Sequence, residues 1–279
     1  MVRKAFGYCY LYLMLLLMYV PILVLIVFSF TNTTYIGQWS GFSFELYSKL
    51  FKSEEIMIAL GNTVIIAVIS AVCSTVLGTL GAIGAFYSKK RTRGVIENLN
   101  QIPVVNAEIV MALSLVVMFV FLGNTIFHTQ LFSFWTLLIG HIIISVPFVY
   151  LNVKPKLQQM DPSLYEAAMD LGCSPRKALN KVIVPSILPG VISGFLLSIT
   201  LSLDDFIVTV FTRGSGLLSG DKAIETLSTL VQAKIKKGPI PPEMRALTTI
   251  IFLIVLLAVV LITIYQNKQS KSKKKRRSY

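Results

Sequence analysis

The chain has 279 residues, of which 54% are hydrophobic and only 14% are charged, and its formal net charge is +13. A soluble domain carries about 25% charged residues, so this composition excludes an ordinary soluble protein and indicates a polytopic membrane protein. The mean hydropathy of +0.73 agrees with that conclusion.

Six apolar segments are long enough to cross a bilayer, which takes about 20 mostly apolar residues per helix. They cover residues 8–30, 60–86, 103–123, 131–153, 185–211 and 246–266. The first exceeds the apolar core of a signal peptide and no Ala-x-Ala site follows it, so we expect it to remain as a span. The predicted fold is an all-α membrane protein with six transmembrane helices, in a single domain covering residues 1–279.

The distribution of Lys and Arg predicts the orientation of these spans. With the N-terminus inside, the cytoplasmic segments carry 18 of the 26 basic residues and the outer loops carry 8. The positive-inside rule then places both termini, the segment 161–184 and the basic tail 267–279 in the cytoplasm of a multi-pass cell-membrane protein. Such a tail contacts anionic membrane lipid, so the net charge needs no nucleic-acid partner.

The outer loops contain no ATP-binding motif. Residues 31–59 form an aromatic, amphipathic stretch, and residues 212–245 include a helix-like run from Ala223 to Ala233. The stretch Gly214–Lys222 looks like a phosphate loop, but its Lys does not directly follow a Gly, and the chain has no Walker A match. The three cysteines form no metal-like cluster with the two histidines. We therefore expect a transport subunit, not an enzyme, with no metal and no cofactor.

The cytoplasmic segment 161–184 has the pattern of a short helix followed by a bend. Ser163–Glu166 is a capping box, and Asp161–Pro162 is a competing start. Gly172 supplies the left-handed residue that ends the helix, and Ser174–Pro175 begins a second helix. An apolar stripe at helical spacing contains Leu164, Ala167, Ala168 and Leu171. So short a stripe must bury either against the protein's own spans or against a partner.

The same segment resembles the cytoplasmic loop of ABC-transporter permeases. The matching string is Glu166-Ala167-Ala168, with Gly172 four residues after the last Ala and Val182-Ile183-Val184-Pro185 beyond it. The resemblance implies a type I ABC importer permease fold, in which the first short helix is the coupling helix that docks on a separate ATPase. The residues it assigns to ATPase coupling are Glu166, Ala167, Ala168, Leu171 and Gly172.

Three acidic residues fall inside the predicted spans, whereas all 26 Lys and Arg lie outside them. They are Glu108 in the third span and Asp204 and Asp205 in the fifth. An ionised acid in hydrocarbon costs about 2.5–3.5 kcal/mol and is a functional-site candidate, and acids without basic partners suit a cationic substrate. Neighbouring helix positions point about 100° apart, so one aspartate is expected to face the pathway, while Glu108 has the alternative of snorkelling to the interface.

Four further strings resemble the spermidine/putrescine (PotC-type) branch of these permeases, namely Tyr19–Phe30, Trp39–Phe42, Glu108–Leu115 and Leu201–Phe206. The resemblance implies three partners: a second, related permease subunit, a cytoplasmic ATPase homodimer and an extracytoplasmic polyamine-binding protein. Two alternatives stay open. One is an ABC permease for ferric iron, an oligosaccharide or an organophosphate. The other is an ATPase-independent carrier or channel, which the coupling loop disfavours.

Overall fold

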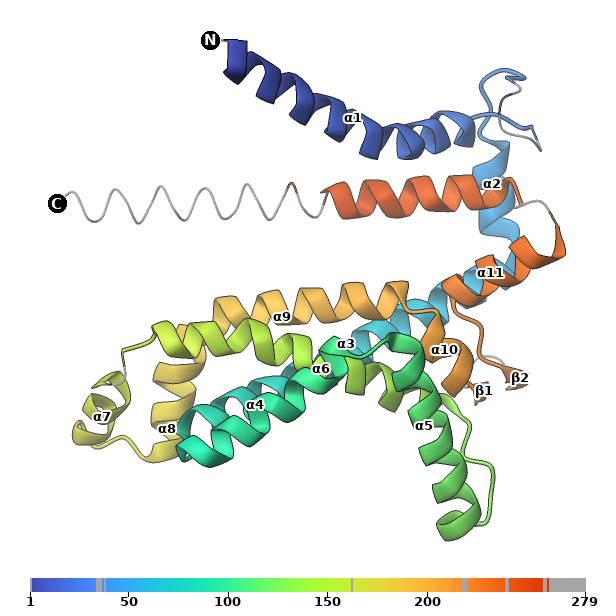
Figure 1. The fold of residues 1–279 in the computed structure, drawn as a ribbon. Coiled ribbons are helices and arrows are strands. Elements are labelled where there is room, and N and C mark those ends of the chain that lie inside the picture. The colour runs from blue at the N-terminus through green and yellow to red at the C-terminus, as the bar shows by residue number, and fades with distance from the viewer. Residues whose placement is uncertain are drawn as a thin grey trace. The chain divides into compact units, whose positions relative to one another are not determined.

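The computed structural model describes residues 2–33, 37, 39–161, 163–216, 220–238, 241–257 and 260. Helices predominate in this part of the chain (Figure 1). Two compact units are formed, one by Met1–Met57 with Ala233–Tyr279 and the other by Ile58–Gln232.

Five helical segments in the described residues are long and apolar enough to cross a membrane. They are Tyr10–Ser29, Glu54–Tyr87, Glu108–Phe127, Phe134–Gln159 and Pro175–Asp204. These segments correspond to the first five predicted spans. The sixth predicted span, 246–266, is helical over 243–257. Its remaining residues, except 260, and the tail 267–279 lie outside the described residues.

In the first unit, α1 (Val2–Ser29) is followed by a short amphipathic helix, α2 (Glu45–Lys52). α2 buries Leu46 and Leu50 on one face and carries an ion pair between Glu45 and Lys49, 2.9 Å apart, on the other. Between the helices the aromatic rings form a cluster, in which Phe30 stacks on Phe42 with their centroids 5.2 Å apart. The aromatic stretch predicted for the first outer loop thus forms a helix and a ring cluster.

In the second unit, α6 (Phe134–Gln159) packs along α9 (Val184–Asp204) and also against α4 (Lys90–Val105). A cluster of buried side chains joins α6 to α9 and to the end of α3 (Glu54–Tyr87); its fully buried members include Val149, Val153, Ile183 and Ile187. α7 (Ser163–Asp170) and α8 (Pro175–Ala178) lie where α6 ends and α9 begins, and α10 (Ile207–Thr212) lies at the opposite end of this unit (Figure 1).

Glycines permit the closest helix contacts in this unit. A Cβ atom on Gly78 of α3 would lie 2.7 Å from Val149 Cβ, and one on Gly190 of α9 would lie 2.7 Å from the Asn152 carbonyl oxygen. Small residues allow membrane helices to approach in this way. Gly84 on the same helix differs from Gly78, because a Cβ there would meet nothing within 4 Å.

The third predicted span, 103–123, is wrong as a continuous helix. α4 ends at Val105, Asn106 and Ala107 have extended backbone, and α5 (Glu108–Leu122) begins anew. α5 continues into a π-helical turn, η1 (Gly123–Phe127). Since the apolar composition runs through the break, hydropathy cannot reveal it. Glu108 is consequently the first residue of a helix and is not interior to one.

The fifth predicted span, 185–211, is also displaced. Its helix starts at Pro175, passes through a π-helical turn, η2 (Leu179–Ile183), continues as α9 and stops at Asp204. The π turn precedes Pro185, which has no N–H to donate and whose ring would clash in a regular α-helix. Asp205 and Phe206 separate α9 from α10, so the two aspartates stand at a helix break.

Two short strands are the exception to the predicted all-α fold. β1 (Ser215–Gly216) and β2 (Gly220–Ala223) pair antiparallel within the glycine-rich stretch that looked like a phosphate loop. The helix predicted from Ala223 instead begins at Leu227, as α11 (Leu227–Lys237). The Thr226 N–H donates to Thr229 Oγ1 at 3.0 Å, which satisfies a backbone group at this start.

Candidate functional site

Helix α7 starts at the second of the two predicted signals. Asp161 Oδ1 accepts hydrogen bonds from the Ser163 hydroxyl at 2.8 Å and from the Ser163 N–H at 3.0 Å. These two donors, the hydroxyl first, hold the pKa of Asp161 below its usual value. Asp161 therefore caps α7, and the capping box that begins at Ser163 does not set the start of the helix.

The C-terminal end of α7 is formed by Gly172. Its φ of +83° is left-handed, as the sequence predicts. The Gly172 N–H donates to the Met169 carbonyl at 2.9 Å, and the Cys173 N–H donates to the Ala168 carbonyl at 3.0 Å. This pair of bonds is a Schellman motif, which reverses the chain and directs it into α8.

The apolar stripe of α7 is only partly covered by the chain itself. Ala168 is 8% exposed, and Tyr165 packs against the core cluster of the second unit. Leu171 is 86% exposed and Leu164 is 44% exposed. Glu166 and Ala167 are exposed as well. α7 is thus anchored on its own spans by one side and presents Leu171 on the other.

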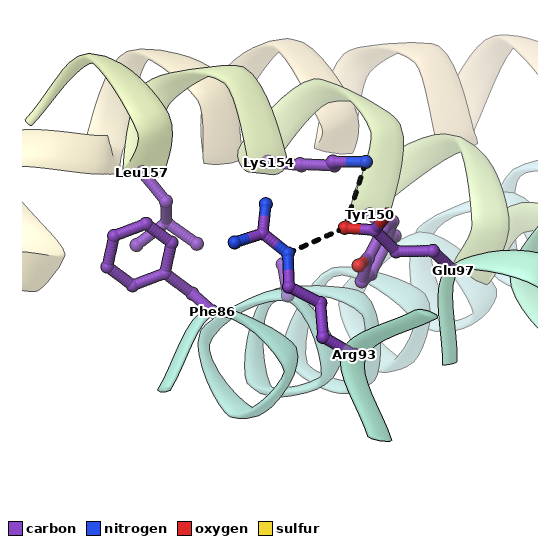
Figure 2. A pocket seen from close by; sticks show the side chains of 7 residues that line it. Phe86, Arg93, Glu97, Tyr150, Lys154 and Leu157 are labelled. Atoms are coloured by element: carbon purple, nitrogen blue, oxygen red, sulfur yellow. Dashed lines mark hydrogen bonds and ion pairs between the residues drawn. The ribbon is translucent and has the colours of Figure 1, made fainter. Parts of the chain in front are cut away.

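An ion-pair cluster, defined here as Arg93, Glu97 and Lys154, ties α4 to α6. Glu97 Oε1 accepts from Arg93 Nε at 2.9 Å and from Lys154 Nζ at 3.0 Å (Figure 2). Tyr150, Phe86 and Leu157 lie around it. Sequence reasoning missed this cluster, although the four-residue spacing of Arg93 and Glu97 on a helix was an available signal.

The packing of α5 on α10 brings the three predicted pathway acids together. Ala112, Leu115 and Phe119 of α5 form a buried cluster with Val208 of α10. As a result the Glu108 carboxyl, at the start of α5, interacts with both Asp205 and Asp204. Glu108 and Asp204 are exposed, whereas Asp205 is 8% exposed.

Asp205 has a dense set of partners. Its Oδ2 accepts from the Thr209 N–H and from the Thr209 hydroxyl, each at 2.7 Å, and its Oδ1 accepts from the Val208 N–H at 3.3 Å. His141 Nε2 lies 3.4 Å from Oδ2. Sequence reasoning missed these partners, because they come from α6 and from the helix that follows the break.

No group of three or more His, Cys, Asp or Glu with metal-site geometry occurs among the described residues. The two helix breaks carry the exposed acids Glu108 and Asp204 and the buried Asp205. Five helices long and apolar enough to cross a membrane, with acids at two helix breaks, indicate a membrane transport protein.

The chain belongs to the family of binding-protein-dependent transport system inner membrane components, whose family model matches residues 74–275. It is a multi-pass inner-membrane permease subunit of an ABC importer, and it is a transport subunit, not an enzyme.

Two curated relatives and one solved structure illustrate the similarity. The chain is 34% identical to the spermidine/putrescine transport system permease protein PotC of Haemophilus influenzae over 81% of this chain and 82% of that protein. It is 31% identical to the putrescine transport system permease protein PotI of Escherichia coli, over 80% and 77%. A bacterial ABC transporter that imports alginate has the same fold, with a TM-score of 0.70, 16% identity, and coverage of 95% and 96%.

Proposed function

We propose that the chain is one permease subunit of an ATP-driven polyamine importer and takes up spermidine, putrescine or both. The observation that carries this proposal is the convergence of Glu108, Asp204 and Asp205 at two helix breaks. No Lys or Arg occurs in residues 94–153 or 182–212, which contain these acids. A polyamine is a flexible chain of ammonium groups, and carboxylates are its natural counter-charges.

The backbone at the end of α9 also favours a positively charged substrate. Asp204 is the last residue of α9, where the free carbonyl groups of a helix end carry a partial negative charge. Discontinuous membrane helices of this kind form substrate sites in transporters, and their C-terminal ends favour cations. The names of the polyamine permeases among the relatives agree with this substrate class. An anionic organophosphate would be repelled by these carboxylates. Membership of an ABC-importer family disfavours the other alternative, an ATPase-independent carrier.

The same proposal includes the membrane orientation of the chain, its partner proteins and its coupling to the ATPase. The chain has six spans with both termini in the cytoplasm, and its basic tail contacts membrane lipid. Its partners are a second, related permease subunit, a cytoplasmic ATPase homodimer and an extracytoplasmic polyamine-binding protein, with no nucleic acid. ATP-driven closure of the ATPase pair moves α7 through its exposed residues Glu166, Ala167 and Leu171. Gly172 holds the bend, and the anchored side at Ala168 passes the movement to the spans.

Leu171→Asp is expected to weaken binding of the ATPase at least tenfold while leaving the permease folded. Leu171 is 86% exposed, so a charge there costs the isolated chain little, whereas burying an unpaired carboxylate in a partner's groove costs several kcal/mol. Co-purification of the ATPase with tagged permease measures the effect, and Leu171→Met is the matched control. Full ATPase recovery with Leu171→Asp would show that α7 docks through other residues.

Asp204→Asn is expected to reduce spermidine uptake about tenfold or more, because a hydrogen bond to a charged group is worth about 1.5–3 kcal/mol. The measurement is ATP-dependent uptake of labelled spermidine into vesicles that hold the co-expressed complex. Thr200→Val is the control, since Thr200 is exposed on the same helix and its hydroxyl bonds only to its own turn, at the Leu196 carbonyl. A complex that hydrolyses ATP but takes up no cationic amine would refute the polyamine proposal and keep the permease fold.

A further inference from the structure

The two adjacent aspartates have different environments. Asp204 is exposed at the end of α9, and no described residue donates a hydrogen bond to its carboxylate. Asp205, one residue later, is buried and accepts three hydrogen bonds from α10. Two neighbouring carboxylates with such unequal surroundings are not equivalent ligands for a passing cation.

A series of side-chain contacts leads to Asp205 across four helices. Ser70 Oγ of α3 donates to Ser202 Oγ of α9 at 3.1 Å. Ser202 Oγ lies 2.7 Å from His141 Nδ1 of α6, and His141 Nε2 lies 3.0 Å from Thr209 Oγ1 of α10. In the last contact of the series, Thr209 Oγ1 donates to Asp205 Oδ2 at 2.7 Å. We call Ser70, Ser202, His141 and Thr209 the donor chain; all four side chains are buried.

The number of available protons determines which atom donates in each hydrogen bond of the donor chain. An ionised Asp205 only accepts hydrogen bonds, so the one hydroxyl proton of Thr209 goes to Oδ2. Thr209 Oγ1 must then accept from His141, which places the imidazole proton on Nε2. His141 Nδ1 accepts in turn from the Ser202 hydroxyl, which leaves Ser202 Oγ free to accept from Ser70. Every donor points toward Asp205, with His141 neutral.

Asp205 also joins the break to two later elements, α10 and α11. Its carboxylate caps the N-terminus of α10 through Val208 and Thr209, and its backbone carbonyl accepts from Ser228 Oγ of α11 at 2.7 Å. The hydrogen-bonding capacity of this residue is thus taken up by the protein. Little remains for a substrate, because the Glu108 carboxyl also interacts with the Asp205 side chain.

We propose that Asp205 is a positioning residue, and that Asp204 and Glu108 are the carboxylates that bind the ammonium groups of the substrate. The donor chain fixes Asp205, and Asp205 fixes the break between α9 and α10. That break in turn holds Asp204 exposed at the end of α9, near Glu108. This inference rests on the proposed transport of polyamines and assigns separate roles to the residues of that site.

The test compares removal of the negative charge at Asp204, Glu108 or Asp205 with removal of the helix cap at Asp205. Asp205→Asn loses the charge but keeps an oxygen that can cap α10, so we expect assembled complex at the wild-type level and a fall in maximal spermidine uptake of about threefold or less. Asp205→Ala loses the cap, and we expect a lower melting temperature of the purified complex and much less uptake per complex. Asp204→Asn and Glu108→Gln should assemble normally and lose at least tenfold in uptake.

The binding role of Asp204 predicts a change that a structural role would not produce. Asp204→Glu should restore most of the uptake, and Asp204→Asn should change the ratio of spermidine to putrescine uptake, because the two amines differ in charge. Asp205→Asn should leave that ratio at the wild-type value. At His141, Gln can accept from Ser202 and donate to Thr209, so His141→Gln should retain the melting temperature that His141→Ala loses.

An assembled Asp205→Asn complex that loses uptake as severely as Asp204→Asn, or that changes the amine ratio, would overturn the inference. Equal melting temperatures for Asp205→Ala and Asp205→Asn would also overturn it. If the wild-type complex transports no polyamine, the proposed function fails. The melting temperatures of the Asp205 and His141 variants then still test the positioning role, because they need no substrate.

Discussion

Gly172→Pro is expected to abolish ATP-coupled uptake while the chain still inserts into the membrane. Proline fixes φ near −65° and has no N–H, whereas Gly172 has a φ of +83° and donates to the Met169 carbonyl. Both bonds of the Schellman motif depend on this backbone conformation, so the bend between α7 and α8 is lost. A Cβ on Gly172 would meet nothing within 4 Å, which means that the effect comes from the backbone and not from a clash.

The matched control is Gly172→Asn, because asparagine tolerates the left-handed conformation better than other residues with side chains. Uptake of labelled spermidine and the rate of ATP hydrolysis are measured side by side in vesicles that hold the complex. We expect hydrolysis without uptake, or loss of the ATPase, for Gly172→Pro, and near-normal coupling for Gly172→Asn. Normal coupling in the proline variant would remove the bend from the transport mechanism.

Gly78→Leu is expected to prevent the second unit from folding. The glycine Cα of α3 faces Val149 of α6, and even a Cβ atom there would lie 2.7 Å from Val149 Cβ and 3.0 Å from the Val146 carbonyl oxygen. Gly194 of α9 contacts the same valine, with a Cβ 3.1 Å from Val149 Cα. Overpacking typically costs about 1–3 kcal/mol, and more where the backbone cannot move; three helices meet at this point.

Gly84→Leu on the same helix is the control, since a Cβ at Gly84 meets nothing within 4 Å. The amount of monodisperse protein extracted in mild detergent measures folding, and we expect at least a tenfold lower yield for Gly78→Leu than for Gly84→Leu. Equal yields would mean that α3 does not approach α6 as closely as described. The comparison separates close packing from the general cost of replacing glycine in a membrane helix.

Local patterns in the sequence were sufficient to predict helix α7 and the existence of most of the apolar helices. Gly172 ends α7 as predicted, because a left-handed residue depends on neighbours within one turn. The start of the helix was open between two signals, and Asp161 decides it by the hydrogen bonds that its carboxylate accepts. The composition of the apolar segments was enough to indicate five of the six predicted spans, although the third and the fifth differ in their bounds.

The breaks within the spans could not be predicted, because hydropathy averages over a window and both breaks lie inside apolar runs. Sequence reasoning therefore treated Asp204 and Asp205 as positions on one continuous helix, whereas they end it. The convergence of Glu108 with them is a tertiary effect, produced by α5 packing on α10. The partners of Asp205 come from other helices, so no local pattern pointed to His141.

The extended backbone at Asn106 and Ala107 bears on how a substrate ion crosses the membrane. Both residues are exposed in this chain and fall within the third apolar run. The Asn106 N–H donates to the Ile102 carbonyl and the Ala107 carbonyl accepts from Val110, which leaves the Asn106 carbonyl and the Ala107 N–H outside the helical bonding. Such groups are tolerated at membrane depth only beside protein or in water. If water reaches them, an ammonium group arriving at Glu108 keeps part of its hydration shell and exchanges the remainder for carboxylate oxygens. Transport then requires only partial dehydration of the ion, which lowers the barrier that the low-dielectric interior would otherwise impose.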